Sequence, residues 1–138
     1  MQVMSKLNHP NIIKLIGAVV ELPHLCLILE YARLGNLRDY LIKNRTSEWK
    51  TYKHAVAIAI SKGMSYLHSR NPPIIHLDLK TTNTLISELT EVKLSDFGTA
   101  RYSTDNNVST TGAIGSQYYI SPEIIRQERF TTATDVYR

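Results

Sequence analysis

The hydrophobic positions between residues 51 and 68 recur with the period of an α-helix. Val56, Ala59 and Gly63 fall on one stripe of this segment together with its aromatic residues, while Lys53 faces the opposite side. An Asn-Pro-Pro sequence follows directly and is typical of a chain that stops being helical. The pattern therefore predicts a long amphipathic helix over residues 51–68.

Other segments carry shorter patterns. Apolar residues at helical spacing over residues 1–8 predict the last turns of a helix, because Pro10 follows and disfavours helix before it. Residues 12–20 and 25–30 are rich in β-branched and apolar side chains and are separated by a short break, which predicts a hairpin of two buried strands. Asn36 stands three residues before an aspartate, a spacing typical of a helix cap.

The second half of the chain alternates short apolar pieces with polar turns. Residues 74–75, 84–86 and 92–94 read as short strands, and a polar turn joins the last two. Residues 102–111 are mostly Ser, Thr, Asp and Asn and have little to bury, so they predict an exposed loop.

Composition narrows the class of protein. The 138 residues are 43% hydrophobic and 20% charged, which is the balance of a globular domain, and the net charge of +4 is spread along the chain rather than gathered in a stripe that binds nucleic acid. No apolar run approaches the ~20 residues that a membrane span needs. The lone Cys26 lies in an apolar run, which predicts a buried thiol in a reducing, cytoplasmic compartment.

Three short blocks in a fixed order carry the candidate chemistry. The first runs from His76 to Asn83, the second is Asp96-Phe97-Gly98, and the third is Ser121-Pro122-Glu123. Together they resemble the protein kinases, and the resemblance extends over essentially the whole chain. These blocks contain two acids, an amide and a lysine, and phosphoryl transfer from a metal-bound nucleotide requires such groups at these separations.

Each of these polar residues has a physical role in that reaction. Asp78 would accept or orient the proton of a substrate hydroxyl, and Lys80 would neutralise charge on the transferring phosphoryl group. Asn83 and Asp96 supply hard oxygen ligands of the kind that Mg²⁺ prefers. The resemblance thus implies ATP and Mg²⁺ as cofactors, with Asp78 and Lys80 catalytic and Asn83 and Asp96 on the metal.

The resemblance also implies where the purine binds. Leu29 takes the gatekeeper position, Glu30 and Ala32 offer backbone hydrogen bonds to adenine, and Leu85 forms the floor beneath the ring. Asp135 matches the buried acid that ties the catalytic loop to the following helix. His76 fits a packed structural histidine, whether or not the family resemblance is used.

The fold class implied is α+β and kinase-like, with a partial small lobe and the first half of the helical large lobe. Residues 1–30 would be a remnant of the small lobe, 31–35 the hinge, and 36–138 an incomplete large lobe containing the catalytic loop and activation segment. The sequence contains neither a Gly-x-Gly-x-x-Gly loop nor a Val-Ala-x-Lys strand. Leu77 stands where many relatives have an arginine that meets a phosphate on the activation loop.

The resemblance implies a serine/threonine protein kinase, because Lys80 and the stretch from Gly115 to Glu123 are of the serine/threonine kind. Residues 15–20 and Asp135-Val136-Tyr137 resemble the tyrosine-kinase-like group of these kinases. The partners of such a kinase would be ATP and a protein substrate with Ser or Thr, without nucleic acid and without a membrane span. The missing motifs imply weak or no activity for this chain alone. Two alternatives stay open: a pseudokinase-like binding or scaffold module, and a non-functional gene fragment.

Overall fold

The computed structural model describes residues 3–44, 49–88, 91–105 and 117–138. Helices and short strands alternate along the chain, and no sheet among these residues has more than two strands. In chain order the elements are η1 Met4–Lys6, β1 Leu15–Glu21, β2 His24–Leu29, α1 Leu37–Lys43, α2 Trp49–His68, β3 Ile74–Ile75, η2 Thr81–Asn83, β4 Thr84–Glu88, β5 Glu91–Leu94, β6 Arg101–Tyr102, η3 Gln117–Tyr119, α3 Pro122–Ile125 and α4 Thr132–Tyr137.

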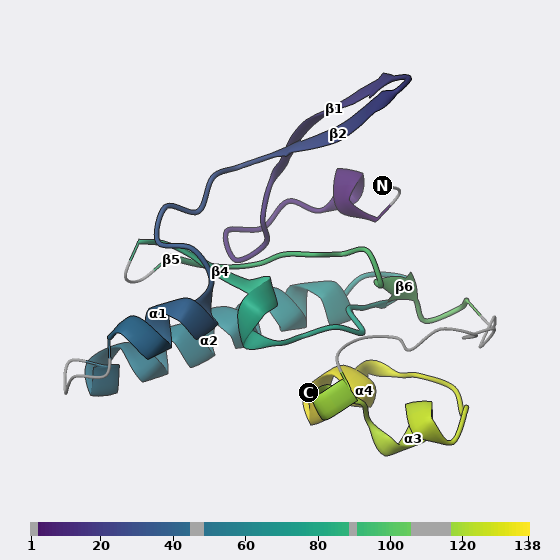
Figure 1. The fold of residues 1–138 in the computed structure, drawn as a ribbon. Coiled ribbons are helices and arrows are strands. Elements are labelled where there is room, and N and C mark those ends of the chain that lie inside the picture. The colour runs from purple at the N-terminus through teal and green to yellow at the C-terminus, as the bar shows by residue number, and fades with distance from the viewer. Residues whose placement is uncertain (1–2, 45–48, 89–90, 106–116) are drawn as a thin grey trace.

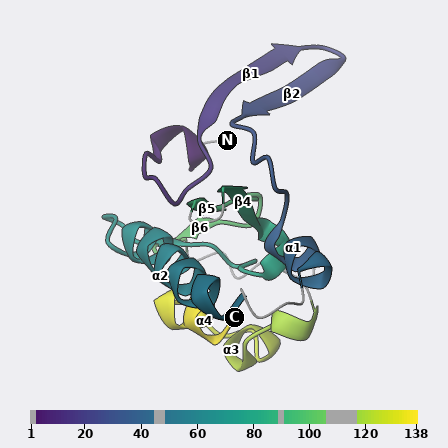
Figure 2. The ribbon, with the colours of Figure 1, turned by 90° about the vertical axis from the view of Figure 1, so that its left-hand side faces the viewer.

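The β1–β2 hairpin projects away from the helical body of the molecule (Figures 1 and 2). The hairpin is present as the hydrophobic pattern predicts, and its antiparallel register runs from Leu15 opposite Leu29 to Glu21 opposite His24. The expected burial is wrong, because every residue of β2 is exposed. The two strands pair only with each other, and Leu15, at the start of β1, is the hairpin residue that packs against a core cluster of the described residues.

The predicted environment of Cys26 is also wrong. Cys26 lies on β2 opposite Val19 and is exposed, not buried. Its apolar neighbours indicated a core position, but apolar sequence buries a residue only where another element packs against it. Cys26 is therefore exposed because the hairpin extends away from the body of the molecule.

Helices α1 and α2 contribute side chains to one hydrophobic cluster in the body of the molecule. Asn36 caps α1 as predicted, since its side chain accepts a hydrogen bond of 2.9 Å from Asp39 N. The long helix α2 begins two residues before the predicted start and ends at His68 as predicted. Its buried stripe includes Val56 and Ala59, which join β4 and β5 in one hydrophobic cluster.

Gly63 sits where α2 approaches the rest of the molecule most closely. A Cβ at this position would lie 2.9 Å from both the Asn11 carbonyl oxygen and Leu94 Cδ1. Leu94 belongs to β5 and also bonds the chain before β1, where Ile13 N donates to Leu94 O at 2.8 Å. The close helix–strand approach therefore holds the N-terminal segment, α2 and β5 together.

The short strands lie close to their predicted positions. β4 pairs with β5 and β3 pairs with β6, both antiparallel. Two segments differ from the expectation: residues 4–6 form a 3₁₀ turn rather than α-helical turns, and Tyr102 forms a strand with Ile74 although residues 102–111 were expected to be a loop. Residues 106–111 of that loop lie outside the described residues.

Helices α3 and α4 follow in the last part of the chain, below the strands in Figure 1. α3 begins with Pro122 at its first position, where a missing N–H has no cost. α4 has a reciprocal cap, because Thr131 accepts from Ala133 N while Thr134 Oγ1 accepts from Thr131 N. No helix in the described parts of the chain is long and apolar enough to cross a membrane.

Candidate active site

The loop from His76 to Lys80 leaves β3 and presents Asp78. Leu77 has a φ of 64°, a left-handed conformation that a leucine rarely adopts. Asp135 on α4 stabilises this turn, since its carboxylate accepts from His76 N at 2.8 Å and from Leu77 N at 2.9 Å. The predicted role of Asp135 as the acid that ties the loop to the next helix is confirmed.

Asp135 has a further partner that the sequence did not reveal. His68 Nε2, at the end of α2, lies 2.9 Å from Asp135 Oδ2. Asp135 is 2% exposed, so its carboxylate is removed from water and must be satisfied by these donors. Nothing in the periodicity of α2 distinguished His68 from a residue on a solvated helix end.

The carboxylate of Asp78 is the centre of a polar cluster. Lys80 Nζ lies 2.6 Å from Asp78 Oδ2, and Asn83 Nδ2 donates to the same oxygen at 2.8 Å. Arg138 Nη1 lies 3.8 Å from the other oxygen, Oδ1. Three of the four polar residues predicted for the site are therefore in direct contact.

The amide of Asn83 is oriented by its two hydrogen bonds to Asp78. Its nitrogen donates to the Asp78 carboxylate and to the Asp78 backbone carbonyl at 2.9 Å. Because both amide hydrogens point toward Asp78, the amide oxygen is the atom that Asn83 presents on its other side. An oxygen in that orientation suits a hard cation, so Asn83 fits the predicted metal role.

Asp96 is brought beside Asn83 through Ser95. Ser95 donates to the Asn83 carbonyl from its backbone N at 2.9 Å and from its hydroxyl at 3.0 Å. Asp96 follows with a φ of 60°, and its Oδ1 lies 3.4 Å from Gly98 N. Within the described ranges, no three His, Cys, Asp or Glu side chains gather as a metal site. The amide oxygen of Asn83 and the carboxylate of Asp96 are of the ligand type that Mg²⁺ prefers.

His76 is a buried structural residue, as expected. Its Nδ1 accepts from Asp78 N at 3.3 Å and its Nε2 lies 3.0 Å from Ser95 O, so the proton is on Nε2. Burial lowers the pKa of His76, partly opposed by the Asp135 carboxylate. The neutral ring packs on Phe97 with centroids 5.0 Å apart, which links the Asp78 and Asp96 segments.

The residues expected to hold adenine lie along one path. Glu30 N donates to Lys14 O and Ala32 O accepts from Gly35 N, so these two backbone groups already have partners within the chain. Leu34 N donates to Ile86 O at 2.9 Å, and this bond places the connection beside β4, which carries Leu85. Leu29 ends β2 immediately before Glu30.

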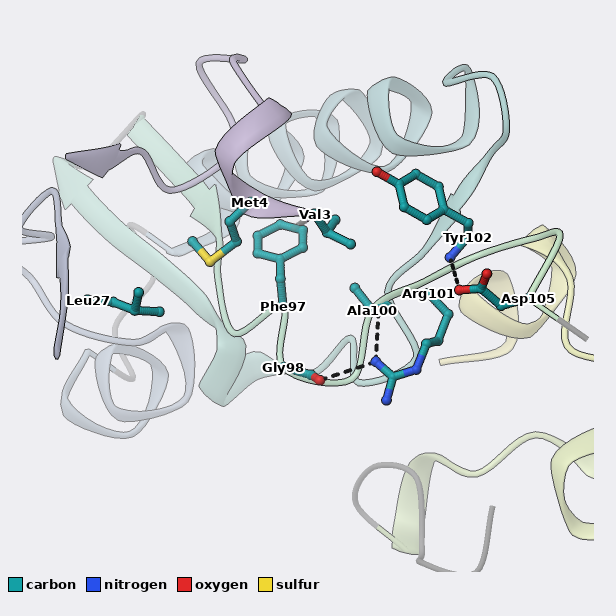
Figure 3. A pocket seen from close by; sticks show the side chains of 9 residues that line it. All are labelled: Val3, Met4, Leu27, Phe97, Gly98, Ala100, Arg101, Tyr102 and Asp105. Carbon is teal, nitrogen blue, oxygen red and sulfur yellow. Dashed lines mark hydrogen bonds between the residues drawn. The ribbon is translucent and has the colours of Figure 1, made fainter. Parts of the chain in front are cut away.

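A cavity of about 350 Å³ lies beside Phe97 and Gly98, the two residues that follow Asp96 (Figure 3). Met4 and Phe97 border it together, and Arg101 closes one side by donating to the Gly98 and Ala100 carbonyls. Neither Asp78 nor Asn83 lines this cavity.

The protein kinase domain model matches residues 1–138, the whole chain. The chain belongs to the protein kinase family. CTR1, a serine/threonine-protein kinase of Arabidopsis thaliana, is 38% identical over 137 residues, which cover 98% of this chain and 17% of CTR1. STY17 of the same plant, also named a serine/threonine-protein kinase, is 38% identical over 135 residues, covering 98% of this chain and 23% of its own length.

A protein of Acanthamoeba polyphaga mimivirus, described as a candidate serine/threonine-protein kinase/receptor, is 43% identical over 138 residues. That match covers 97% of this kinase chain and 8% of the viral protein. The chain thus spans 8% to 23% of the length of these three relatives. The family expected from the three sequence blocks is confirmed, and the mixed helix and strand content agrees with part of a kinase fold.

Proposed function

We propose that this chain carries the catalytic loop of a serine/threonine protein kinase, which transfers the γ-phosphoryl group of ATP to a Ser or Thr hydroxyl of a protein. The observation that carries the proposal is the shared oxygen of Asp78: Lys80 and Asn83 both bond Oδ2, on a loop that Asp135 holds in place. Asp78, Lys80 and Asn83 are thereby pre-organised before any substrate arrives.

The roles follow from the chemistry of each group. Asp78 orients the substrate hydroxyl and takes up its proton, and Lys80 places a positive charge beside the phosphoryl oxygens. Asn83 and Asp96 would hold Mg²⁺ through their side-chain oxygens. When bound, that ion supplies positive charge between the phosphates of ATP.

The proposed binding site for the adenine ring of ATP is formed by the end of β2, the chain that follows it, and β4. Leu29, Glu30, Ala32 and Leu85 would hold the purine, with Leu29 limiting its depth and Leu85 beneath it. In this proposal residues 1–30 belong to the small lobe, 31–35 to the hinge and 36–138 to the large lobe. The exposed thiol of Cys26 suits a reducing, cytoplasmic compartment.

The 138-residue chain by itself is proposed to be weak or inactive. Its sequence has no glycine-rich loop and no Val-Ala-x-Lys lysine, and these groups grip the β- and γ-phosphates in the family. The same observation favours a second candidate, a non-functional gene fragment, whereas the retained Asp78, Lys80 and Asn83 favour the enzyme over a pseudokinase-like module that binds nucleotide or a partner without turnover.

Phosphate transfer from radiolabelled ATP to a generic protein substrate tests both parts. The purified chain should transfer phosphate near background, and robust Asp78-dependent turnover would contradict its proposed weakness. The same chain should be extended by whatever kinase motifs the genomic DNA encodes upstream of Met1. In that longer protein we expect Asp78→Asn to lower kcat by about 10²–10⁴-fold and removal of Mg²⁺ to abolish transfer.

Glu128→Gln is the matched control, because Glu128 is an exposed acid outside the site. Phosphoamino-acid analysis should find phosphoserine or phosphothreonine. A longer protein that binds Mg²⁺–ATP yet shows no Asp78-dependent transfer would instead establish the binding-module alternative.

A further inference from the structure

Lys93 on β5 is a nearly buried lysine that the proposed chemistry does not use. It is 8% exposed, whereas lysine side chains are rarely buried unless they are paired. Its Nζ lies 2.9 Å from Glu30 Oε1 and 3.2 Å from the Pro10 carbonyl oxygen, with Glu91 Oε1 at 4.0 Å. The ammonium group therefore joins three parts of the chain that are distant in sequence.

The Glu30 carboxylate is itself fixed from a second side. Lys14 N donates to Glu30 Oε1 at 3.1 Å, and Glu30 N donates back to Lys14 O at 3.0 Å. One carboxylate oxygen is thus shared between a backbone N–H and the Lys93 ammonium. This arrangement orders the side chain and the backbone of Glu30 together.

β5 is firmly attached on its other side. Asn11 Nδ2 donates to Val92 O at 2.9 Å, and Leu94 N donates to Asn11 O at 2.9 Å. Since β5 leads within two residues into Asp96, Lys93 connects the strand that ends at the proposed metal ligand to the start of the proposed adenine connection. The two ends of the nucleotide site are joined through this ion pair.

We propose that Lys93 is a positioning residue for nucleotide binding: through Glu30 it fixes the backbone of residues 30–32 relative to Asp96. The inference rests on the proposed function, because it needs that backbone to be the adenine site. Figure 1 shows why such a link matters, since the hairpin extends away from the body and the chain returns from β2 past β4 and β5. Without the pair, the return segment keeps backbone bonds to Lys14 and Ile86 and the exposed Arg33–Glu88 ion pair, and the Glu30 carboxylate keeps its bond from the Lys14 N–H.

Removing the Lys93 ammonium takes the charged partner away from the Glu30 carboxylate, which is 26% exposed and can reach water. In Lys93→Met the Glu30 carboxylate turns toward water, and we expect the backbone of residues 30–32 to sample other positions. Coupling between a supporting residue and a binding site is typically about two- to thirtyfold in affinity. The adenine end should show this loss, because only that end depends on Glu30.

Adenosine is the appropriate probe, because it has the purine and lacks the phosphates. Its binding to the 138-residue chain is measured by the shift of the Ala32 amide signal in ¹⁵N–¹H spectra, and hydrogen exchange of amides 30–35 is measured separately without ligand. Lys93→Met is compared with Lys93→Arg, which keeps the charge. Lys14→Met is the matched control, since Lys14 is exposed and contacts Glu30 through its backbone.

We expect Lys93→Met to weaken adenosine binding and to speed exchange of amides 30–35, Lys93→Arg to restore both substantially, and Lys14→Met to match wild type. If Lys93→Met does not fold, Glu30→Gln removes the same pair and should give the same two effects. Unchanged exchange of amides 30–35 in a folded variant without the pair overturns the inference, whatever adenosine does.

The two proposals fail in different ways. If adenosine leaves the Ala32 signal of the wild-type chain unshifted at millimolar concentration, the adenine assignment is wrong and with it the nucleotide role of Lys93. If wild type binds adenosine and Lys93→Met binds it equally well, the adenine assignment stands and the positioning role is overturned.

Discussion

The protonation state of His76 is decided by the packing around a single side chain. The ring has no exposed surface, and both its nitrogens have fixed partners in Asp78 N and Ser95 O. A second proton would place a positive charge in this enclosed site and would break the contact from Asp78 N. The histidine therefore stays neutral where an exposed one would titrate.

The stability of the fold should consequently fall in mild acid. The pKa of His76 lies below its ordinary value of 6.5 in the folded chain, so the unfolded chain binds the proton more readily. The contribution of the neutral His76 ring to the free energy of unfolding is fully present above pH 6.5. It is lost as pH falls toward the pKa of the folded chain, at a slope of at most about 1.4 kcal/mol per pH unit. Urea unfolding of wild type and His76→Gln between pH 7.5 and 5 checks this.

The difference between the two curves isolates His76, because every other titrating group is present in both proteins. A His76→Gln curve parallel to that of wild type would show that the imidazole does not control the loss.

At the scale of elements, Gly63 allows α2 to pack closely against Asn11 and β5, because it has no side chain. Helix propensity favours Ala over Gly at position 63 by about 1 kcal/mol. Asn11 O and Leu94 Cδ1 oppose that preference, because each lies 2.9 Å from the point that the added methyl carbon would occupy. The backbone carbonyl of Asn11 cannot retreat easily, since the same oxygen accepts from Leu94 N. Packing should therefore outweigh propensity.

Gly63→Ala should destabilise the fold by about 1–3 kcal/mol in spite of its better helix propensity, because the added methyl overpacks the α2–β5 contact. Lys62→Ala, one residue earlier on the exposed face, should change the free energy of unfolding by less than about 0.5 kcal/mol. Chemical denaturation of both variants measures the difference. A stabilised Gly63→Ala protein would mean that α2 shifts to accept the methyl.

On the scale of the whole molecule, the hairpin exposes apolar surface on both strands. Val20 and Leu25 face each other across the strands and are 67% and 65% exposed. Apolar surface of this kind favours association with other surfaces, and unpaired strand edges add to that tendency. The isolated chain should therefore self-associate through the hairpin.

Replacing Val20 and Leu25 together by threonine should reduce self-association in sedimentation velocity experiments. Threonine keeps strand propensity, and both positions are exposed, so the free energy of unfolding should change by about 0.5 kcal/mol or less. Ile13→Ala is the contrasting variant, since Ile13 is 2% exposed and should cost about 2–5 kcal/mol. Unchanged association of the double variant would assign the contact to another surface.

Local sequence was sufficient for much of the architecture. Helical periodicity located α2 to within two residues, and short apolar runs located β3, β4 and β5. It failed where burial depends on partners distant in sequence: Cys26 and the rest of β2 are exposed because the hairpin extends away from the body, and only its first residue, Leu15, packs against a core cluster of the described residues. The strand at Tyr102 was missed because its partner, Ile74, lies far away along the chain.

The candidate site also contains residues that the sequence predicted and supporting residues that it did not. The order of Asp78, Lys80, Asn83 and Asp96 identified the family, because polar residues in a fixed order reflect a shared reaction. The partners that hold them were not readable: His68 on Asp135, Ser95 on Asn83 and Lys93 on Glu30 are ordinary residues in ordinary local patterns. Each becomes significant only through a contact between separate elements.

The amino-acid sequence by itself determined the family, helices α1 and α2 and the residues proposed for the reaction, since these depend on residue type and near-neighbour spacing. Tertiary structure alone decided which Asp78 oxygen meets Lys80, which way the Asn83 amide points and which strands remain uncovered. Those properties depend on distances between segments far apart in the chain, and only the folded backbone sets these distances.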